Sequence, residues 1–146
     1  MEVLQAEIKH LEPIAALFDQ YRVFYGQRSD LASARKFLQE RLQNRDSVIF
    51  VASDRQIVGF TQFYPSYSSV SMQRIWILND LFVAATHRRK GIARLLLATA
   101  QQYAQSTEAI GIILATQIFN CSAQALYESL GYTKDEEFYH YSLRLK

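Results

Sequence analysis

Apolar residues recur every three or four positions in four stretches of the chain, which is the spacing of an amphipathic helix. In the first stretch, Ile14, Leu17 and Tyr21 would share one face. Gly26 follows this stretch and Gly131 follows the last one, and a glycine in that place typically ends a helix. The pattern predicts four helices: residues 12–25, a second that begins after Ser29 or Asp30, residues 91–105 and residues 122–130.

Six other stretches show the alternation or the β-branched and aromatic content that is typical of strands. Asp54 and Arg55 leave a turn-length gap between two of them, which predicts an antiparallel hairpin. Residues 64–70 contain Pro65 and several serines and predict a connecting loop. The predicted strands are residues 3–9, 47–53, 56–64, a long one from 73 or 74 to 83, 110–115 and 137–145.

The order of these elements, βααβββαβαβ, predicts an α/β fold with one mixed sheet and helices on both faces. A length of 146 residues suits one domain, and five glycines and two prolines leave no room for a linker, so we expect a single domain over residues 1–146. The 16 basic residues nearly balance the 14 acidic ones. This balance argues against a protein that wraps nucleic acid or coats an anionic membrane.

Several classes of protein are disfavoured by what the chain lacks. No apolar stretch approaches the ~20 residues that a membrane-spanning helix needs. Glu2 follows Met1 without the pattern of a signal peptide, so we expect a cytoplasmic protein. Cys121 is the only cysteine and cannot form an internal disulfide, and the three histidines lack the spacing of metal ligands. No metal is therefore expected.

A basic, glycine-containing turn connects the long strand to the third predicted helix and reads R-x-x-G-x-A. The first N–H groups of a helix have no intrahelical partners, and together with nearby cations they can bind phosphate oxygens. A glycine lets a ligand approach the backbone closely. The alternative interpretation is a solvated basic turn that binds nothing. The residues concerned are Arg88, Arg89, Lys90, Gly91, Ile92 and Ala93.

Residues 120–132 read N-x-x-A-x-x-L-Y-x-x-L-G-Y. Together with the long strand and the R-x-x-G-x-A turn, in this order and spacing, the chain resembles the GNAT superfamily of acyl-CoA-dependent N-acetyltransferases. The resemblance is close from Arg74 to Tyr132 and architectural elsewhere. It implies a mostly antiparallel sheet of about seven strands flanked by about four helices. It also implies that acetyl-CoA, the co-substrate, binds where the fourth and fifth strands diverge.

The resemblance also implies roles for individual residues. The end of the fourth strand, formed by Leu81, Phe82 and Val83, would pair with the pantetheine arm of CoA as an added strand would. The basic turn would hold the pyrophosphate. Asn120 would bind the pantetheine arm, and Tyr127 would be the general acid beside the thioester sulfur. From the residues alone, Asn120 could instead cap its own backbone ahead of a helix that Ser122 begins, and Tyr127 could be a core tyrosine.

The general base is a separate question, because many family members carry an acid on the fourth or fifth strand. The fifth predicted strand has none, which leaves Asp80 as the candidate. Strand side chains alternate, so Asp80 and Phe82 should share one face. The alternative is that Asp80 is a structural hydrogen-bond acceptor under the first helices. Cys121, at the start of a helix, is interpreted as a small loop residue rather than as a nucleophile.

The expected activity is acetyl transfer to a primary amine of a small molecule, or to a lysine or N-terminal amine, in a ternary complex. One alternative is a non-catalytic acetyl-CoA-binding sensor, which the missing acid of the fifth strand favours. Nucleic-acid binding by the basic turn is a more distant one, because so short a turn makes few phosphate contacts. We also expect a homodimer through the aromatic C-terminal segment. Aromatic residues that could line the acceptor side are Tyr21, Phe24, Tyr25, Tyr64 and Tyr67.

Overall fold

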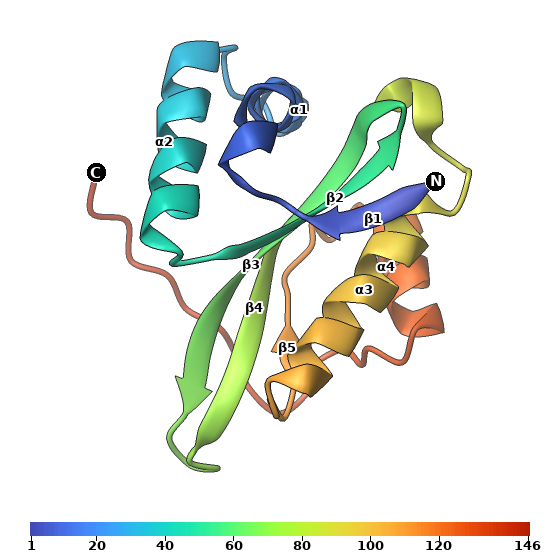
Figure 1. The fold of residues 1–146 in the computed structure, drawn as a ribbon. Coiled ribbons are helices and arrows are strands. Elements are labelled where there is room, and N and C mark those ends of the chain that lie inside the picture. Colours follow the sequence, from blue (N-terminus) through green and yellow to red (C-terminus); the bar gives the residue numbers. More distant parts are fainter. The chain divides into compact units, whose positions relative to one another are not determined.

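Five strands form one sheet in the computed structural model, which describes residues 1–146 (Figure 1). The strands follow one another across the sheet in chain order. The first four pair antiparallel, and the fifth pairs in parallel with the fourth, which confirms the predicted mixed sheet. Their bounds are β1 Glu2–Gln5, β2 Val48–Asp54, β3 Gln56–Ser68, β4 Gln73–Val83 and β5 Ile112–Ile113.

The expectation of seven strands is wrong, since the sheet has five. Residues 137–145 form neither helix nor strand, although their side chains alternate. The Asp135 carboxylate accepts hydrogen bonds from the backbone N–H groups of Glu137 and Phe138, at 2.9 and 3.2 Å. This local turn occupies groups that a partner strand would need.

Two other predicted segments differ from the structure. β3 continues to Ser68 through the predicted loop, and Pro65 pairs with Trp76 of β4. Pairing of β3 with β2 ends at Phe63, so Pro65 lies on an edge, where a residue without an N–H is tolerated. The predicted buried strand over residues 110–115 is reduced to β5, in which Ile113 is half exposed.

The four predicted helices are confirmed, each with ends within about two residues of those expected. Gly26 and Gly131 have φ of 88° and 94° just after the first and last helices, the left-handed conformation that ends a helix. Residues 8 and 9 of the first predicted strand instead belong to a short 3-10 helix. The bounds are η1 Ile8–His10, α1 Leu11–Phe24, α2 Leu31–Asn44, η2 Ala85–His87, α3 Ile92–Ser106 and α4 Cys121–Ser129.

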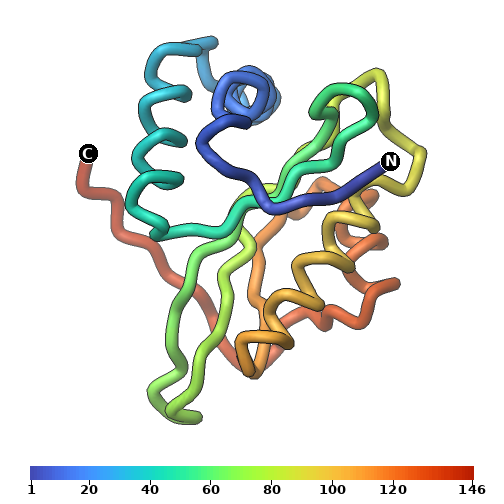
Figure 2. Tube along the Cα trace, viewed as in Figure 1, coloured from blue at the N-terminus to red at the C-terminus, as the bar shows by residue number.

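Helices cover both faces of the sheet, as predicted (Figure 2). α1 and α2 form one apolar cluster with Ile49, Phe60 and Phe82 of the sheet. On the other face, Tyr103 of α3 contacts the rings of Phe63 and its neighbours Phe50 and Trp76. A Cβ on Gly59 would lie 3.2 Å from the Phe82 carbonyl oxygen and 3.4 Å from two side chains of α3. A glycine in β3 therefore lets α3 pack closely beside the end of β4.

A β-bulge in β4 decides which side chains face α1. Gln62 pairs with Asp80 while the next residue, Phe63, pairs with Leu78, so Asn79 is the extra residue. Beyond the bulge, Asp80 and Phe82 lie on the face covered by α1 and α2, as the predicted alternation requires. Before it, Leu78 lies opposite Phe63 on the α3 face.

The chain divides into two compact units, Met1–Leu114 and Ala115–Lys146. The first contains the sheet with α1, α2 and α3, and the second contains α4. None of the helices combines the length and the apolar character that crossing a membrane requires.

Candidate active site

The Asp80 carboxylate is buried at the bulge of β4 and is surrounded by hydrogen-bond donors. The side-chain amide of Gln62 donates to Oδ2 at 2.7 Å, and the amide of Asn79 donates to Oδ1 at 3.1 Å. Tyr21 of α1 also bonds to the carboxyl and reaches the Asn79 carbonyl oxygen at 3.4 Å. Only 4% of Asp80 is exposed. All three partners donate, so the site is built for an ionised carboxylate.

Burial and these hydrogen bonds act on the pKa of Asp80 in opposite directions. Burial raises its pKa above the ordinary 3.8, and the bonds from Gln62, Tyr21 and Asn79 lower it, with burial the larger effect. Tyr64 of β3 is half-buried nearby, and its pKa rises to about 12 through burial and the charge of Asp80. A carboxylate with a raised pKa, placed at a strand end, is a reasonable acceptor of a proton.

The end of β4 has an edge that β5 does not pair with. Pairing with β5 involves only Trp76 and Ile77, so Leu81, Phe82 and Val83 lie beyond it. The side chains of Phe82 and Val83 are buried. This edge can accept an extended, amide-containing ligand as an added strand would be accepted.

The first turn of α3 lacks a side-chain cap. Gly91 is the N-cap residue, with φ of 78°, and the first helical bond runs from the Leu95 N–H to its carbonyl at 3.1 Å. The N–H groups of Ile92 and Ala93 therefore have no intrahelical partner. By contrast, Asp30 caps α2 and Asn120 caps α4 through their side chains. No atom lies within 4 Å of the place where a Cβ of Gly91 would be, so this turn fits a phosphate group.

The three basic residues before Gly91 differ in their surroundings. The Arg88 Nε donates to the Val83 carbonyl oxygen at 3.0 Å, and its guanidinium lies over the rings of Phe24 and Phe82. Arg89 and Lys90 are exposed, and Arg89 has φ of 61°. Arg88 is exposed as well, but its Nε and the face of its guanidinium are engaged by the protein itself. We therefore expect Arg89 and Lys90 to contribute most of the attraction for an anion.

Asn120 and Tyr127 lie in the second unit, at the start and near the end of α4. The Asn120 carbonyl oxygen accepts a hydrogen bond from the Ala123 N–H at 3.1 Å, so Asn120 itself is the N-cap. The Tyr127 ring lies 5.8 Å from the Tyr132 ring, measured between centroids. The structure thus brings Asp80, the strand edge and the basic turn together in the first unit, and places these two residues on one short helix.

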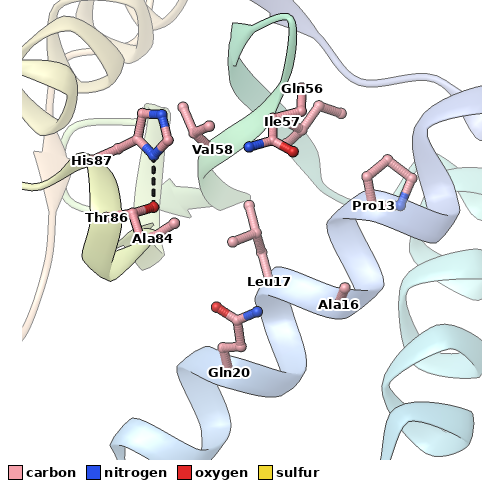
Figure 3. Close-up of a pocket in the computed structure, with 10 residues that line it drawn as sticks. All are labelled: Pro13, Ala16, Leu17, Gln20, Gln56, Ile57, Val58, Ala84, Thr86 and His87. Carbon is pink, nitrogen blue, oxygen red and sulfur yellow. Dashed lines mark hydrogen bonds between the residues drawn. The ribbon is translucent and has the colours of Figure 1, made fainter.

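One pocket is lined in part by Ala84, Thr86 and His87, between the end of β4 and the basic turn (Figure 3). Its volume is about 270 Å³, and its lining includes Leu17 and Gln20 of α1 and Val58 of β3. The Nδ1 atom of His87 lies 2.8 Å from the Thr86 hydroxyl. None of the predicted site residues belongs to the pocket, and its lining contains no carboxylate.

The sequence analysis did not find the partners of Asp80. Gln62 lies on β3 and Tyr21 on α1, and only the sheet pairing and the packing of α1 bring them near the carboxylate. Ser47, just before β2, bonds Gln62 in turn. One signal was present, because Gln62 is a polar residue between the apolar residues Phe60 and Phe63 of the predicted strand.

Residues 14–132 match the model of the acetyltransferase (GNAT) family. The chain belongs to the GNAT family. It is 47% identical over 146 residues to the uncharacterized N-acetyltransferase YhfO of Bacillus subtilis (strain 168), covering 99% of this chain and 98% of that protein. A probable acetyltransferase of Haemophilus influenzae is 31% identical over 110 residues, 74% of this chain and 75% of that one. The crystal structure of a probable acetyltransferase, 44% identical, superposes with a TM-score of 0.95 over 100% of this chain and 99% of that one.

The GNAT protein is thus an N-acetyltransferase, and its fold is the GNAT fold with a five-stranded sheet. Members of this family use acetyl-CoA.

Proposed function

We propose that this GNAT enzyme transfers the acetyl group of acetyl-CoA to a primary amine by direct attack in a ternary complex, with Asp80 as the general base. The observation that carries the proposal is the buried Asp80 carboxylate, held by donors beside the unpaired edge of β4. An amine is protonated at neutral pH and must lose a proton before it attacks. A carboxylate whose pKa is raised can accept that proton, directly or through water.

Three groups of residues would hold acetyl-CoA. The edge formed by Leu81, Phe82 and Val83 would pair with the pantetheine arm, and the first turn of α3 would bind the pyrophosphate. There Gly91, Ile92 and Ala93 offer backbone N–H groups, and Arg89 and Lys90 add charge. The amide nitrogen of Asn120 would donate to the pantetheine arm. When bound, acetyl-CoA supplies the thioester carbonyl that the amine attacks.

Two further groups of the chain would assist the transfer. A backbone N–H near Phe82 or Val83 would donate to the thioester oxygen as negative charge develops on it. The Tyr127 hydroxyl would give its proton to the departing sulfur. Direct attack needs no covalent enzyme intermediate, so Cys121 has no role in the proposal.

Aromatic residues at the end of α1 support a cationic acceptor. The Tyr21 and Tyr25 ring centroids lie 5.0 Å apart, and Phe24 lies 5.3 Å from Tyr25. These rings, with Asp80 close to Tyr21, suit an ammonium group on a small molecule or on a protein side chain. Tyr67 does not join them, because it bonds Arg74 on the β3–β4 hairpin at 2.9 Å.

The proposal is tested by incubating the protein with acetyl-CoA and a panel of amines while following thiol release. Asp80→Asn should lower kcat/KM by ~10²-fold or more, the size of a general-base contribution, without weakening acetyl-CoA binding. Asp54→Asn, at the exposed end of β2, is the matched control and should behave as the wild type. Tight acetyl-CoA binding without turnover over a broad panel would instead support a sensor. Full activity in Asp80→Asn would remove Asp80 as the base.

A further inference from the structure

Gln62 is a fully buried polar side chain in the middle of β3. Its neighbours along the chain, Thr61 and Phe63, are also fully buried. A primary amide in such a place destabilises the fold unless its oxygen and its nitrogen both find partners. Both partners are present, and one of them is the carboxylate proposed as the base.

The orientation of the Gln62 amide is fixed by its two partners. The Asp80 carboxylate can only accept when ionised, so the atom that faces it at 2.7 Å must be the Gln62 nitrogen. The Gln62 oxygen then faces Ser47, whose hydroxyl donates to it at 2.8 Å. The ionised carboxylate thus fixes the orientation of the amide, and Ser47, just before β2, supplies the donor that the buried amide oxygen needs.

Few titratable groups face Asp80 from the elements around it. Tyr21 faces it from α1, and Tyr64 is close enough on β3 for the charge of Asp80 to raise its pKa. Arg41 of α2 and Asp46 act on Tyr64 and bond to each other at 2.7 Å. Of the two side-chain amides that bond to the carboxyl, that of Gln62 is the nearer, at 2.7 Å against 3.1 Å for Asn79. Gln62 is a neutral donor that does not titrate.

We propose that Gln62, held by Ser47, is a positioning residue that keeps the Asp80 carboxylate oriented and ionised for proton removal. This inference rests on the proposed function, because it concerns the base named there. Gln62 does not contact substrate in this account. It bonds Oδ2, while Asn79 bonds Oδ1 at the bulge.

The variant Gln62→Met tests this role, because methionine is similar in length and lacks donors. Loss of the hydrogen bond should raise the pKa of Asp80, since that bond lowers it in the wild type. The acid limb of the kcat/KM profile should then move to higher pH. At mildly acidic pH the variant should lose roughly 10-fold more activity than on the alkaline plateau, the size expected for one bond to a charged group. Ser47→Ala should move the limb in the same direction by less.

Thr61→Val is the matched control. Thr61 is equally buried on the same strand, and its hydroxyl donates at 2.8 Å to the backbone carbonyl of Asp80 rather than to the carboxylate. This variant should lose stability, as Gln62→Met does, but its acid limb should stay where the wild type has it. An acid limb at the same pH in Gln62→Met and Thr61→Val would show that Gln62 is merely structural, and would overturn the inference.

A carbon-13 NMR titration of the Asp80 carboxyl separates this inference from the proposed function. If the Asp80 pKa does not rise in Gln62→Met, the positioning role is wrong whatever the enzyme does. If it rises while the kcat/KM profile is unmoved, the positioning role holds for the carboxyl and Asp80 is not the base, so the proposed function fails and the catalytic part of the inference falls with it. A rise in both supports both.

Discussion

The guanidinium of Arg88 lies over the ring of Phe82, with its central carbon 5.3 Å from the ring centroid. The same group lies 5.5 Å from the Phe24 centroid, and its Nε bonds to the Val83 carbonyl oxygen. Arg88 therefore ties the end of α1 to the end of β4. The first basic residue of the R-x-x-G-x-A turn is thus used in part by the fold itself, and we expect the helix terminus and the next two residues to supply most of the attraction for phosphate.

Replacing Arg88 and Arg89 in turn should separate the contribution of the basic residues to folding from their contribution to phosphate binding. Arg88→Ala should lower stability by about 1–2 kcal/mol, the combined size of a cation–π contact and a hydrogen bond, and change the acetyl-CoA Kd little. Arg89→Ala should leave stability unchanged and weaken acetyl-CoA binding, less so at high salt because the interaction is screened. Urea unfolding and calorimetric titration at two salt concentrations measure both. A salt-sensitive loss of binding in Arg88→Ala would contradict the assignment.

Gly91 offers a direct test of the phosphate site. Its φ of 78° is strained for any other residue, and a side chain there would project into the open space in front of the α3 N–H groups. Gly91→Val should raise the acetyl-CoA Kd at least ~10-fold, or ~1.4 kcal/mol. Gly26→Val carries the same kind of strain, at φ of 88° after α1, and should lose stability without losing affinity. Unchanged affinity in folded Gly91→Val would eliminate the site.

Asp80 should give the folding stability a pH dependence of definite sign. Burial raises its pKa in the folded protein above the ordinary 3.8. Such a group stabilises the fold below its unfolded pKa, and that contribution is lost as pH rises through the folded pKa. Relative to Asp80→Asn, the wild type should therefore lose stability as pH rises from about 4, by ~1.4 kcal/mol per unit of pKa increase. Urea unfolding of both proteins between pH 4 and 8 measures this, and a difference that grows with pH in favour of the wild type would contradict it.

Helices were predictable from the sequence because their spacing is local. Gly26 and Gly131 mark helix ends through their own backbone conformation, which no distant residue has to supply. Strand faces were predictable only where pairing is regular. The bulge at Asn79 arises from the register between β3 and β4, and no pattern in the residues next to Asn79 predicts it.

The candidate site was predictable in its backbone elements and not in its side-chain contacts. The strand-to-helix turn at Gly91 follows from neighbouring residues, whereas the edge of β4 came from the family resemblance and depends on where β5 pairs. The bonds from Gln62 and Tyr21 to Asp80, and the contact of Arg88 with Phe24, join residues far apart in the chain. Alternation in residues 137–145 indicated a strand. A strand must pair with another strand, however, and alternation does not show whether such a partner is present.

The C-terminal segment leads us to expect a homodimer. Three aromatic side chains in it are largely exposed: Phe138 at 71%, Tyr139 at 90% and Tyr141 at 92%. Exposure of apolar ring surface to water is unfavourable, and association would bury it. Light scattering at high concentration should give about twice the mass of 16.9 kDa, and Tyr139→Ser with Tyr141→Ser should restore the single mass. Val70→Ser with Met72→Ser, equally exposed on the β3–β4 hairpin, should not. A single 16.9 kDa species in the wild type would count against the dimer.

Tyr127 is tested by removing one oxygen atom. Tyr127→Phe keeps the ring that packs 5.8 Å from Tyr132, so folding and acetyl-CoA binding should survive. A CoA thiolate, with a thiol pKa near about 8.5, leaves fairly well without help, so kcat should fall by only ~10²-fold, the lower end for general-acid catalysis. If Tyr127 is only a packing residue, kcat should hold and stability should drop by about 1 kcal/mol for a lost hydrogen bond.

The neighbouring tyrosine supplies the control for this variant. The Tyr132 hydroxyl is buried without a hydrogen-bond partner, so Tyr132→Phe should be neutral or stabilising and should keep the wild-type kcat. Measuring kcat and the thermal midpoint on both variants separates chemistry from packing, because only a catalytic hydroxyl lowers kcat while the midpoint stays. Wild-type kcat in Tyr127→Phe with a lowered midpoint would exclude the proton donor and leave the thiolate to depart unaided.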